Sequence, residues 1–260
     1  MIPEPVRGPL SAFVAGLGGI HREAVLAVWL AGSWARGCGV VGHSDLDLLL
    51  VLRGEVTPEQ QAETAAHAAD QCPGCDLTAV TEDQLRADVW PTPVHFLVKG
   101  GGTLVQQPEG SRDSLLLRQD VAEAGLRAYG HPHAGSARPV PWRLLQSGID
   151  HVLPHLRSHF DHPALVLCRV AFACVHRRLC SKVQAGEWAL RALPAALRGA
   201  VRADPQSYQR GTVAELDGHA LAHLEHHGLL AAAASRTATQ SPRGATPPGG
   251  AQGECAAVDG

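Results

Sequence analysis

The chain has 260 residues, of which 45% are hydrophobic and 18% charged, so disorder over its whole length is excluded. Its formal net charge of −3 disfavours a nucleic-acid partner, because phosphate binding needs clustered positive charge. No apolar run reaches the roughly 18 residues of a membrane span. The N-terminal stretch MIPEPVRGPL lacks the basic and apolar regions of a secretory signal. We therefore expect a cytoplasmic protein that binds neither nucleic acid nor membranes.

The first half of the chain alternates between short apolar runs and longer polar stretches. The apolar runs predict strands over residues 24–31, 45–52, 76–80 and 94–98. Helices are predicted over residues 10–22, 58–70 and 114–129. Thr57 and Pro58 supply an N-cap and a first-turn proline for the second of these helices. The alternation predicts an α/β domain over residues 1–135.

The second half is predicted to be helical. A linker rich in Gly and Pro covers residues 131–141. Helices are then predicted over residues 141–159, 164–181, 185–192, 194–202 and 207–226. Their spacing is typical of an antiparallel bundle, which we place at residues 141–230. Residues 231–260 are poor in apolar side chains and predict a disordered tail.

Two acidic residues and a Gly-Ser pair carry the clearest chemical signal. Asp45 and Asp47 alternate along a strand, so they project from one face and repel each other. A divalent cation removes that repulsion. Gly32 permits close approach of the backbone to a ligand, and Ser33 at a helix start offers donors to a phosphate. The alternative is a turn capped by Ser44-Asp45, with Asp47 partly exposed.

The pattern hGSx(11)DhDh resembles the nucleotidyltransferase superfamily related to DNA polymerase β. Its members carry a third carboxylate on a later strand, which Asp76 matches. The stretch LAGSWARGCGVVGHSDLDLLLVL further resembles the streptomycin/spectinomycin adenylyltransferases, an aminoglycoside adenylyltransferase family, and residues 166–169, 181–182 and 186–194 resemble their helical domain. The resemblance covers about residues 8–210. It implies an α/β N-terminal nucleotidyltransferase domain, with a mixed sheet and helices, followed by an all-α C-terminal helical bundle.

The resemblance also implies a reaction, in which AMP passes from ATP to a hydroxyl of an aminoglycoside or aminocyclitol antibiotic and confers resistance. Asp45 and Asp47 are then expected to hold Mg²⁺, and Asp76 to accept the proton of the attacking hydroxyl. The expected partners of this chain, which we predict to be a monomer, are ATP and a small polycationic antibiotic. The residues that match the family's nucleotide-binding positions are Gly32, Ser33, Arg169 and Lys182.

Three of these assignments have alternatives. Arg169 interrupts the apolar stretch LVLCRVAF, where a structural salt bridge within the bundle also satisfies a guanidinium. Lys182 lies at a predicted helix end, where it also complements the helix dipole. Asp76 replaces the glutamate that is common in the family, and its reach is shorter by roughly 1.3–1.5 Å, a scale of misplacement that costs about 100-fold in rate. Asp76 is therefore a base, a metal ligand or a residue that acts through water.

The acceptor side departs from the pattern of streptomycin-accepting enzymes. These carry a tryptophan shortly after the position of Phe96 and an acidic residue before the second C-terminal helix. Residues 97–101 contain no tryptophan, and His159 takes the acidic position. Spectinomycin is therefore favoured over streptomycin, with Asp161 and His162 as candidate acceptor-binding residues. The alternatives are a nucleotidyltransferase of the same fold that acts on a protein or another acceptor, and a catalytically weak ligand-binding relative.

Two further patterns resemble metal sites. Cys72-Pro-Gly-Cys75 is a lone CxxC, whereas a structural zinc site needs four ligands, so we interpret these cysteines as reduced thiols in a loop. His151, His155 and His159 recur at helical spacing. Because the chain has 15 histidines, a solvated helix face explains this recurrence better than a metal site.

Overall fold

The computed structural model describes residues 1–100, 102–106, 110–111, 114–131, 135–155, 163–192 and 201. The elements of the first half are α1 (Glu4–His21), η1 (Arg22–Ala24), β1 (Val25–Leu30), α2 (Gly32–Ala35), β2 (Leu46–Leu52), α3 (Pro58–Gln71), β3 (Cys75–Thr81), α4 (Glu82–Arg86), β4 (Phe96–Lys99), β5 (Thr103–Val105), α5 (Ser114–Ala124) and β6 (Leu126–Gly130). Those of the second half are α6 (Trp142–Val152), η2 (Leu153–His155), α8 (Pro163–His176) and α9 (Lys182–Ala192).

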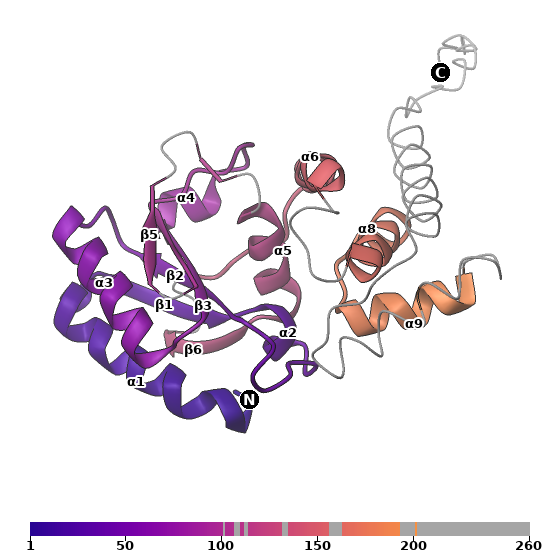
Figure 1. The fold of residues 1–260 in the computed structure, drawn as a ribbon. Helices are drawn as coiled ribbons and strands as arrows, with labels where there is room; N and C mark the ends of the chain where they lie inside the picture. The colour runs from indigo at the N-terminus through magenta and orange to yellow at the C-terminus, as the bar shows by residue number, and fades with distance from the viewer. Residues whose placement is uncertain are drawn as a thin grey trace, which may run out of the picture.

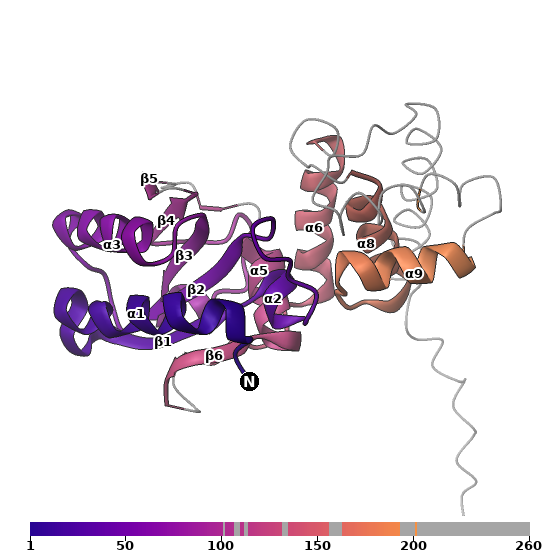
Figure 2. The same cartoon turned by 60° about the horizontal axis from the view of Figure 1, so that its bottom comes forward.

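The strands form one sheet within the described residues, in the order β5-β4-β3-β2-β1-β6. The sheet is mixed, as expected, because β2 and β3 pair in parallel while the neighbouring pairs are antiparallel. The crossover between β2 and β3 is made by α3. In both ribbon views α1 and α3 lie side by side over one face, while α6, α8 and α9 lie beyond α5 (Figures 1 and 2).

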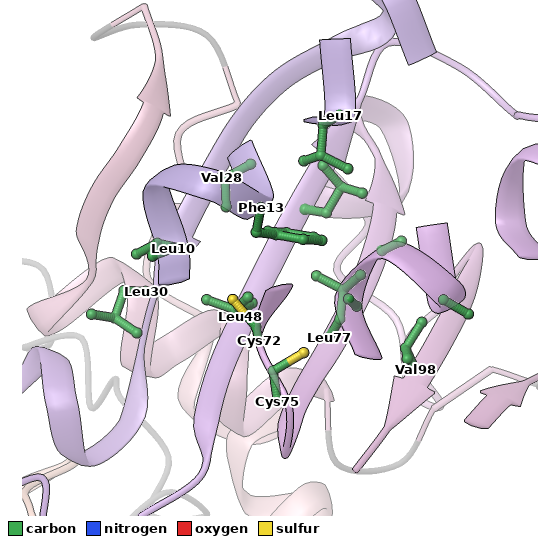
Figure 3. Packing of buried hydrophobic residues seen from close by; sticks show 14 of the residues in the cluster. Leu10, Phe13, Leu17, Val28, Leu30, Leu48, Cys72, Cys75, Leu77 and Val98 are labelled. Carbon is green, nitrogen blue, oxygen red and sulfur yellow. The ribbon is translucent and has the colours of Figure 1, made fainter. Parts of the chain in front are cut away.

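The face covered by α1 and α3 holds the main hydrophobic core. Strand alternation points Leu48, Leu50 and Leu52 to this face, and all three are fully buried. Phe13 of α1 lies over the middle of these strands (Figure 3). The other α1 side chains in this core follow at helical spacing and are Val6, Leu10 and Leu17.

The opposite face of the sheet is covered by α4 and α5. Leu49 and Val51 of β2 pack there with Val121 of α5. Asp47 precedes Leu49 by two residues, so its side chain lies on this second face. The alternation of β2 thus separates a wholly apolar face from one that carries a carboxylate at its end.

The four strands predicted from the sequence are confirmed, each to within two residues at either end. The helix predicted over residues 58–70 is also confirmed as α3. It begins with a capping box, in which the Gln60 amide donates to the Thr57 hydroxyl at 3.3 Å and the Gln60 side chain accepts from the Thr57 amide.

The helix predicted over residues 114–129 is wrong at its C-terminal end. It stops at Ala124, and the following residues form β6, which pairs with β1 after Gly125. The helix expected from residue 10 starts earlier, at Glu4, because Pro3 and Pro5 favour a helix start rather than preventing one.

Of the described helices of the second half, α6 and α8 are shorter than predicted and α9 is longer. α6 ends at Val152, and α8 ends where Arg177 takes a left-handed conformation, with φ at 55°. α9 begins at Lys182 rather than residue 185, because Ser181 accepts the Gln184 amide at 3.0 Å. The helices predicted over residues 194–202, except residue 201, and 207–226 lie outside the described residues, as does the tail at 231–260. Among the helices that the structure describes, none has the length and apolar character needed to cross a membrane.

Candidate active site

Two carboxylates face each other across the parallel strand pair. Asp47 of β2 stands directly opposite Asp76 of β3 in the register, so both project from the α5 face of the sheet. Asp45 lies just before β2 and is exposed, whereas Asp47 and Asp76 are half-buried. The structure therefore places the three predicted carboxylates at the N-terminal ends of β2 and β3, on one face of the sheet.

The environment of Asp47 disfavours its ionised form. Its pKa is raised from its ordinary value of 3.8 to about 6, in the first place by burial. Three nearby carboxylates raise it further, those of Asp120, Asp76 and Asp45. Arg169 is the cation that lowers it. A positive charge at this edge would relieve the repulsion.

This donor set fits a magnesium ion better than a closed protein site. Within the described ranges, no three His, Cys, Asp or Glu side chains are arranged to hold a metal ion. Mg²⁺ is usually bound by one or two carboxylates, with water and substrate phosphates completing the octahedron. Asp45 and Asp47 supply two carboxylates of this kind, beside a site whose charge needs a cation.

Gly32 packs directly against Asp47. Its φ of +62° is left-handed, and a Cβ at this position would overlap the Asp47 carboxylate. Its amide donates to Asp120 Oδ2 at 2.7 Å. Ser33 follows and is half-buried. Only glycine fits between the first strand and the carboxylate.

Asp120, Arg36 and Glu123 are residues that sequence reasoning missed. Arg36 Nη2 lies 2.6 Å from Asp120 Oδ1 and 3.2 Å from Glu123 Oε2. The Arg36 and Asp120 side chains are 10% and 5% exposed, so the pair is screened weakly by solvent. Burial disfavours the Arg36 charge, but the two carboxylates raise its pKa overall. A signal existed, because Asp120 follows an apolar stretch and shares a helix face with Leu116.

Lys99 was also missed, and it holds Asp76. Lys99 Nζ lies 2.8 Å from Asp76 Oδ2, and the Gly100 amide donates to Asp76 Oδ1 at 3.1 Å. Alternation along β4 places Lys99 on the same face as Leu97, toward the carboxylates. Asp76 is thus oriented by the end of the neighbouring strand.

Arg169 and Lys182 come from the second half. Arg169 is half-buried on α8, and its Nε donates to the Cys180 carbonyl at 2.9 Å. No carboxylate among the described residues lies within ion-pair distance of it, so the structural salt bridge offered as an alternative is not present there. Lys182 is the first residue of α9. A cation there opposes the helix dipole, which contradicts the alternative based on that dipole.

The remaining candidates divide into buried and undescribed residues. Cys72 and Cys75 belong to the main core, close to Leu48 and Leu77 (Figure 3), which corrects their interpretation as loop thiols. Burial raises the pKa of these thiols to about 12 and about 11. The acceptor candidates Asp161 and His162, and the histidine repeat at His159, lie outside the described residues.

Comparison with known proteins locates the second half of the chain in a family. Residues 141–232 match the family model described as "Aminoglycoside adenylyltransferase, C-terminal domain". This part of the chain thus resembles the C-terminal domain of the aminoglycoside adenylyltransferases. The matched region contains α6, α8 and α9, with Arg169 and Lys182.

A solved structure has a similar fold over most of the chain. Spectinomycin adenyltransferase AAD(9) from Enterococcus faecialis, with ATP and spectinomycin, superposes with a TM-score of 0.70 at 15% identity. The alignment covers 85% of this chain and 98% of that one. A toxin–antitoxin structure with AMP-PNP aligns with a TM-score of 0.27 at 14% identity, over 56% of this chain and 87% of that one. No curated protein matches the sequence.

Proposed function

We propose that this enzyme transfers AMP from ATP to a hydroxyl of an aminocyclitol antibiotic, with spectinomycin favoured over streptomycin. The observation that carries the proposal is the pair Asp47 and Asp76, set side by side in register with Arg169 close enough to lower the pKa of Asp47. The solved relative with the same fold holds ATP and spectinomycin. A metal-bound triphosphate suits this charge pattern, because its metal ion would pair with the carboxylates and its phosphates with Arg169.

Asp45 and Asp47 are the residues that would hold Mg²⁺. The bound ion would neutralise phosphate charge and stabilise the negative charge that develops during phosphoryl transfer. The repulsion that raises the pKa of Asp47 favours a cation at this edge. Asp47 must be ionised to serve as a ligand.

Asp76 is the proposed general base. It accepts the proton of the acceptor hydroxyl as that oxygen attacks the α-phosphorus of ATP, and pyrophosphate leaves with the bonding electrons of the broken P–O bond. The Lys99 ammonium and the Gly100 amide fix the direction of its two oxygens. The side chain is 34% exposed, so an acceptor can approach it.

The nucleotide is proposed to lie between the sheet edge and the second half of the chain. Arg169 and Lys182 contribute the cations for the triphosphate. Their side chains belong to one region, because Arg169 donates to the carbonyl of Cys180, two residues before Lys182. Ser33 contributes a hydroxyl donor to the phosphates, while Gly32 allows the backbone to approach the nucleotide.

The proposed preference for spectinomycin rests on residues 97–101, which the resemblance places near the acceptor. Residues 97–101 lack the tryptophan of streptomycin-accepting enzymes. That range contains Lys99 instead, whose ammonium pairs with Asp76. An acceptor that needs an aromatic platform at this position is therefore disfavoured.

A direct assay tests the proposal. The purified full chain is incubated with ATP and Mg²⁺ together with spectinomycin, streptomycin or no acceptor, and the antibiotics are examined by mass spectrometry. We expect an adduct of one AMP unit on spectinomycin and much less on streptomycin. An adduct on streptomycin alone would overturn the preference. Absence of adduct on both, with Asp47→Asn as the inactive reference, would overturn the antibiotic as acceptor and favour a protein or another molecule.

A further inference from the structure

One buried charge network reaches from the sheet edge to the second half of the chain. It starts at Gly32, whose amide donates to Asp120 Oδ2 at 2.7 Å. Arg36 Nε donates to Asp120 Oδ1 at 2.7 Å, and Arg36 Nη2 lies 3.2 Å from Glu123 Oε2. Gly32 also packs against Asp47. The Glu123 carboxylate is therefore linked through two side chains to the loop beside the proposed metal ligand.

The same carboxylate contacts the turn between α8 and α9. The Leu179 amide donates to Glu123, at 2.9 Å to Oε2 and 3.1 Å to Oε1. Gln119 Nε2 donates to Oε1 at 2.6 Å, which fixes the carboxylate on α5. The residue after Leu179 is Cys180, whose carbonyl accepts from Arg169 Nε at 2.9 Å. Glu123 thus lies between Gly32, which packs against Asp47, and the turn whose Cys180 carbonyl holds Arg169.

The turn between α8 and α9 packs against the protein at its C-terminal end. Residues 175–178 are exposed, whereas residues 179–181 are buried. Leu179 packs in a cluster that contains Leu115 of α5 and Val170 of α8. The apolar contact holds the turn near α5, but apolar contacts are not directional. The hydrogen bonds to Glu123 are the directional contacts that set its orientation.

We propose that Glu123 is a positioning residue that sets where Arg169 stands relative to Asp47, by joining the turn between α8 and α9 to the Gly32 loop. This inference rests on the proposed function, because it assigns Glu123 to the binding of the same triphosphate. Glu123 itself does not contact the substrate in this account. It acts through Arg36 and Asp120 on one side and through the Leu179 amide on the other.

A small displacement is enough to matter at such a site. Misplacement by about 1 Å costs about 100-fold in rate. Glu123→Ala removes the acceptor of the Leu179 amide and one partner of Arg36. We therefore expect kcat/KM to fall about 10- to 100-fold, and affinity for a non-hydrolysable ATP analogue to weaken about tenfold.

A double-mutant cycle separates positioning from general destabilisation. In an Arg169→Ala background, Glu123→Ala should change affinity for the ATP analogue by less than about twofold, because the residue through which it acts is absent. Additive effects of the two substitutions would overturn the proposal. Glu82→Gln is the matched control, since it breaks an exposed Glu82–Arg86 pair of 2.6 Å on α4. It should leave affinity unchanged.

A second measurement needs no nucleotide. Cys180 is buried, and burial together with the charge of Glu123 contributes to a pKa of about 11, so its thiol should react slowly with iodoacetamide in the native protein. Glu123→Ala should raise the alkylation rate of Cys180 at least about tenfold, because local opening of the turn costs less without its hydrogen bonds. Cys168, buried on α8, is the internal control and should stay protected.

The outcomes distinguish this proposal from the proposed function. Protection of Cys180 equal to that in the wild type would overturn the role of Glu123, whatever the nucleotide results. A wild-type chain that binds no ATP analogue would overturn the proposed function, while Cys180 still reports on Glu123. If Glu123→Ala melts below the assay temperature and exposes both cysteines, Glu123→Gln replaces it. Its uncharged side chain keeps a single acceptor oxygen, so it should give a smaller change at Cys180 alone.

Discussion

The two faces of the sheet receive alternate residues of the same strands but have opposite characters. On the α1 and α3 side, Leu48 and Leu50 are fully buried among apolar side chains. On the α5 side, Leu49 and Val51 are equally buried, but the row ends in Asp47 beside three other carboxylates. The first face stabilises the fold. The second contributes to stability along most of its length and gathers charge at one edge.

This difference shows how a short strand serves two purposes. Because side chains alternate, β2 turns its even-numbered residues to the core under α1 and α3, and its odd-numbered residues to the face that ends in Asp47. The repulsion between the carboxylates is confined to one end of the strands. The packing of the opposite face stabilises the fold against it. Substitutions on the two faces should therefore separate activity from stability.

The largest expected effect is loss of activity in Asp47→Asn. An uncharged amide is a much weaker magnesium ligand than a carboxylate, and loss of several kcal/mol of transition-state stabilisation corresponds to about 1,000-fold or more in turnover. Steady-state adenylyl transfer to spectinomycin measures this loss. Asp70→Asn, an exposed aspartate on α3, is the control and should keep full activity. Turnover near that of the wild type in Asp47→Asn would contradict the metal assignment.

The next effect belongs to the other face. Leu50→Ala removes a fully buried side chain from the core under α1 and α3 and should destabilise the protein by about 2–5 kcal/mol. Denaturant unfolding measures the change. Turnover per folded molecule should stay within about twofold of the wild type at low temperature. A large loss of turnover in the folded variant would show that the two faces are not independent.

Lys182→Ala tests whether the charged edge of the sheet faces a cation from α9. Loss of a charge-assisted hydrogen bond should weaken binding of a non-hydrolysable ATP analogue by about 1.5–3 kcal/mol. Calorimetric titration measures the affinity, and Lys182→Arg should retain most of it. Equal affinity in Lys182→Ala and the wild type would remove Lys182 from the nucleotide site.

The smallest effect is a dependence of stability on pH. The pKa of Asp47 is about 6 in the folded chain, against an ordinary value of 3.8, so between these pH values the folded state holds a proton that the unfolded state has released. Stability from this residue is therefore lost as pH rises toward 6 and levels off above it. In metal-free buffer, Asp47→Asn should stabilise the protein by about 1 kcal/mol more at pH 7 than at pH 5. Thermal unfolding at both pH values tests this, and an equal gain at both would contradict the raised pKa.

Much of the sheet could be predicted because its inner strands are continuous apolar runs. β1 and β2 have neighbours on both sides and are buried on both faces, so local sequence identifies them. β6 is an edge strand with no fully buried residue, and LRAYG also suits a helix. Its conformation depends on pairing with β1, about 100 residues earlier in the chain, which no local pattern contains.

The site could be predicted in part for the same reason. Asp45, Asp47 and Asp76 interrupt apolar runs, and alternation predicts their common face. The neighbours of Arg36, Lys99 and Asp120 in the sequence do not identify the charges that these residues meet. Their partners come from distant elements, as in the pair Arg36 and Asp120. Only the folded arrangement shows that these charges meet.

The direct register of Asp47 and Asp76 limits which insertions and deletions the chain can tolerate. A gain or loss of one residue inside β3 would move the carboxylate of Asp76 to the apolar face and bring a leucine or cysteine into its place. A change of two residues would keep the face but shift the carboxylate along the strand by about 7 Å. Insertions and deletions in related sequences should therefore avoid β2 and β3. They should occur in connections such as residues 53–57, where they change neither the alternation of side chains nor the strand register.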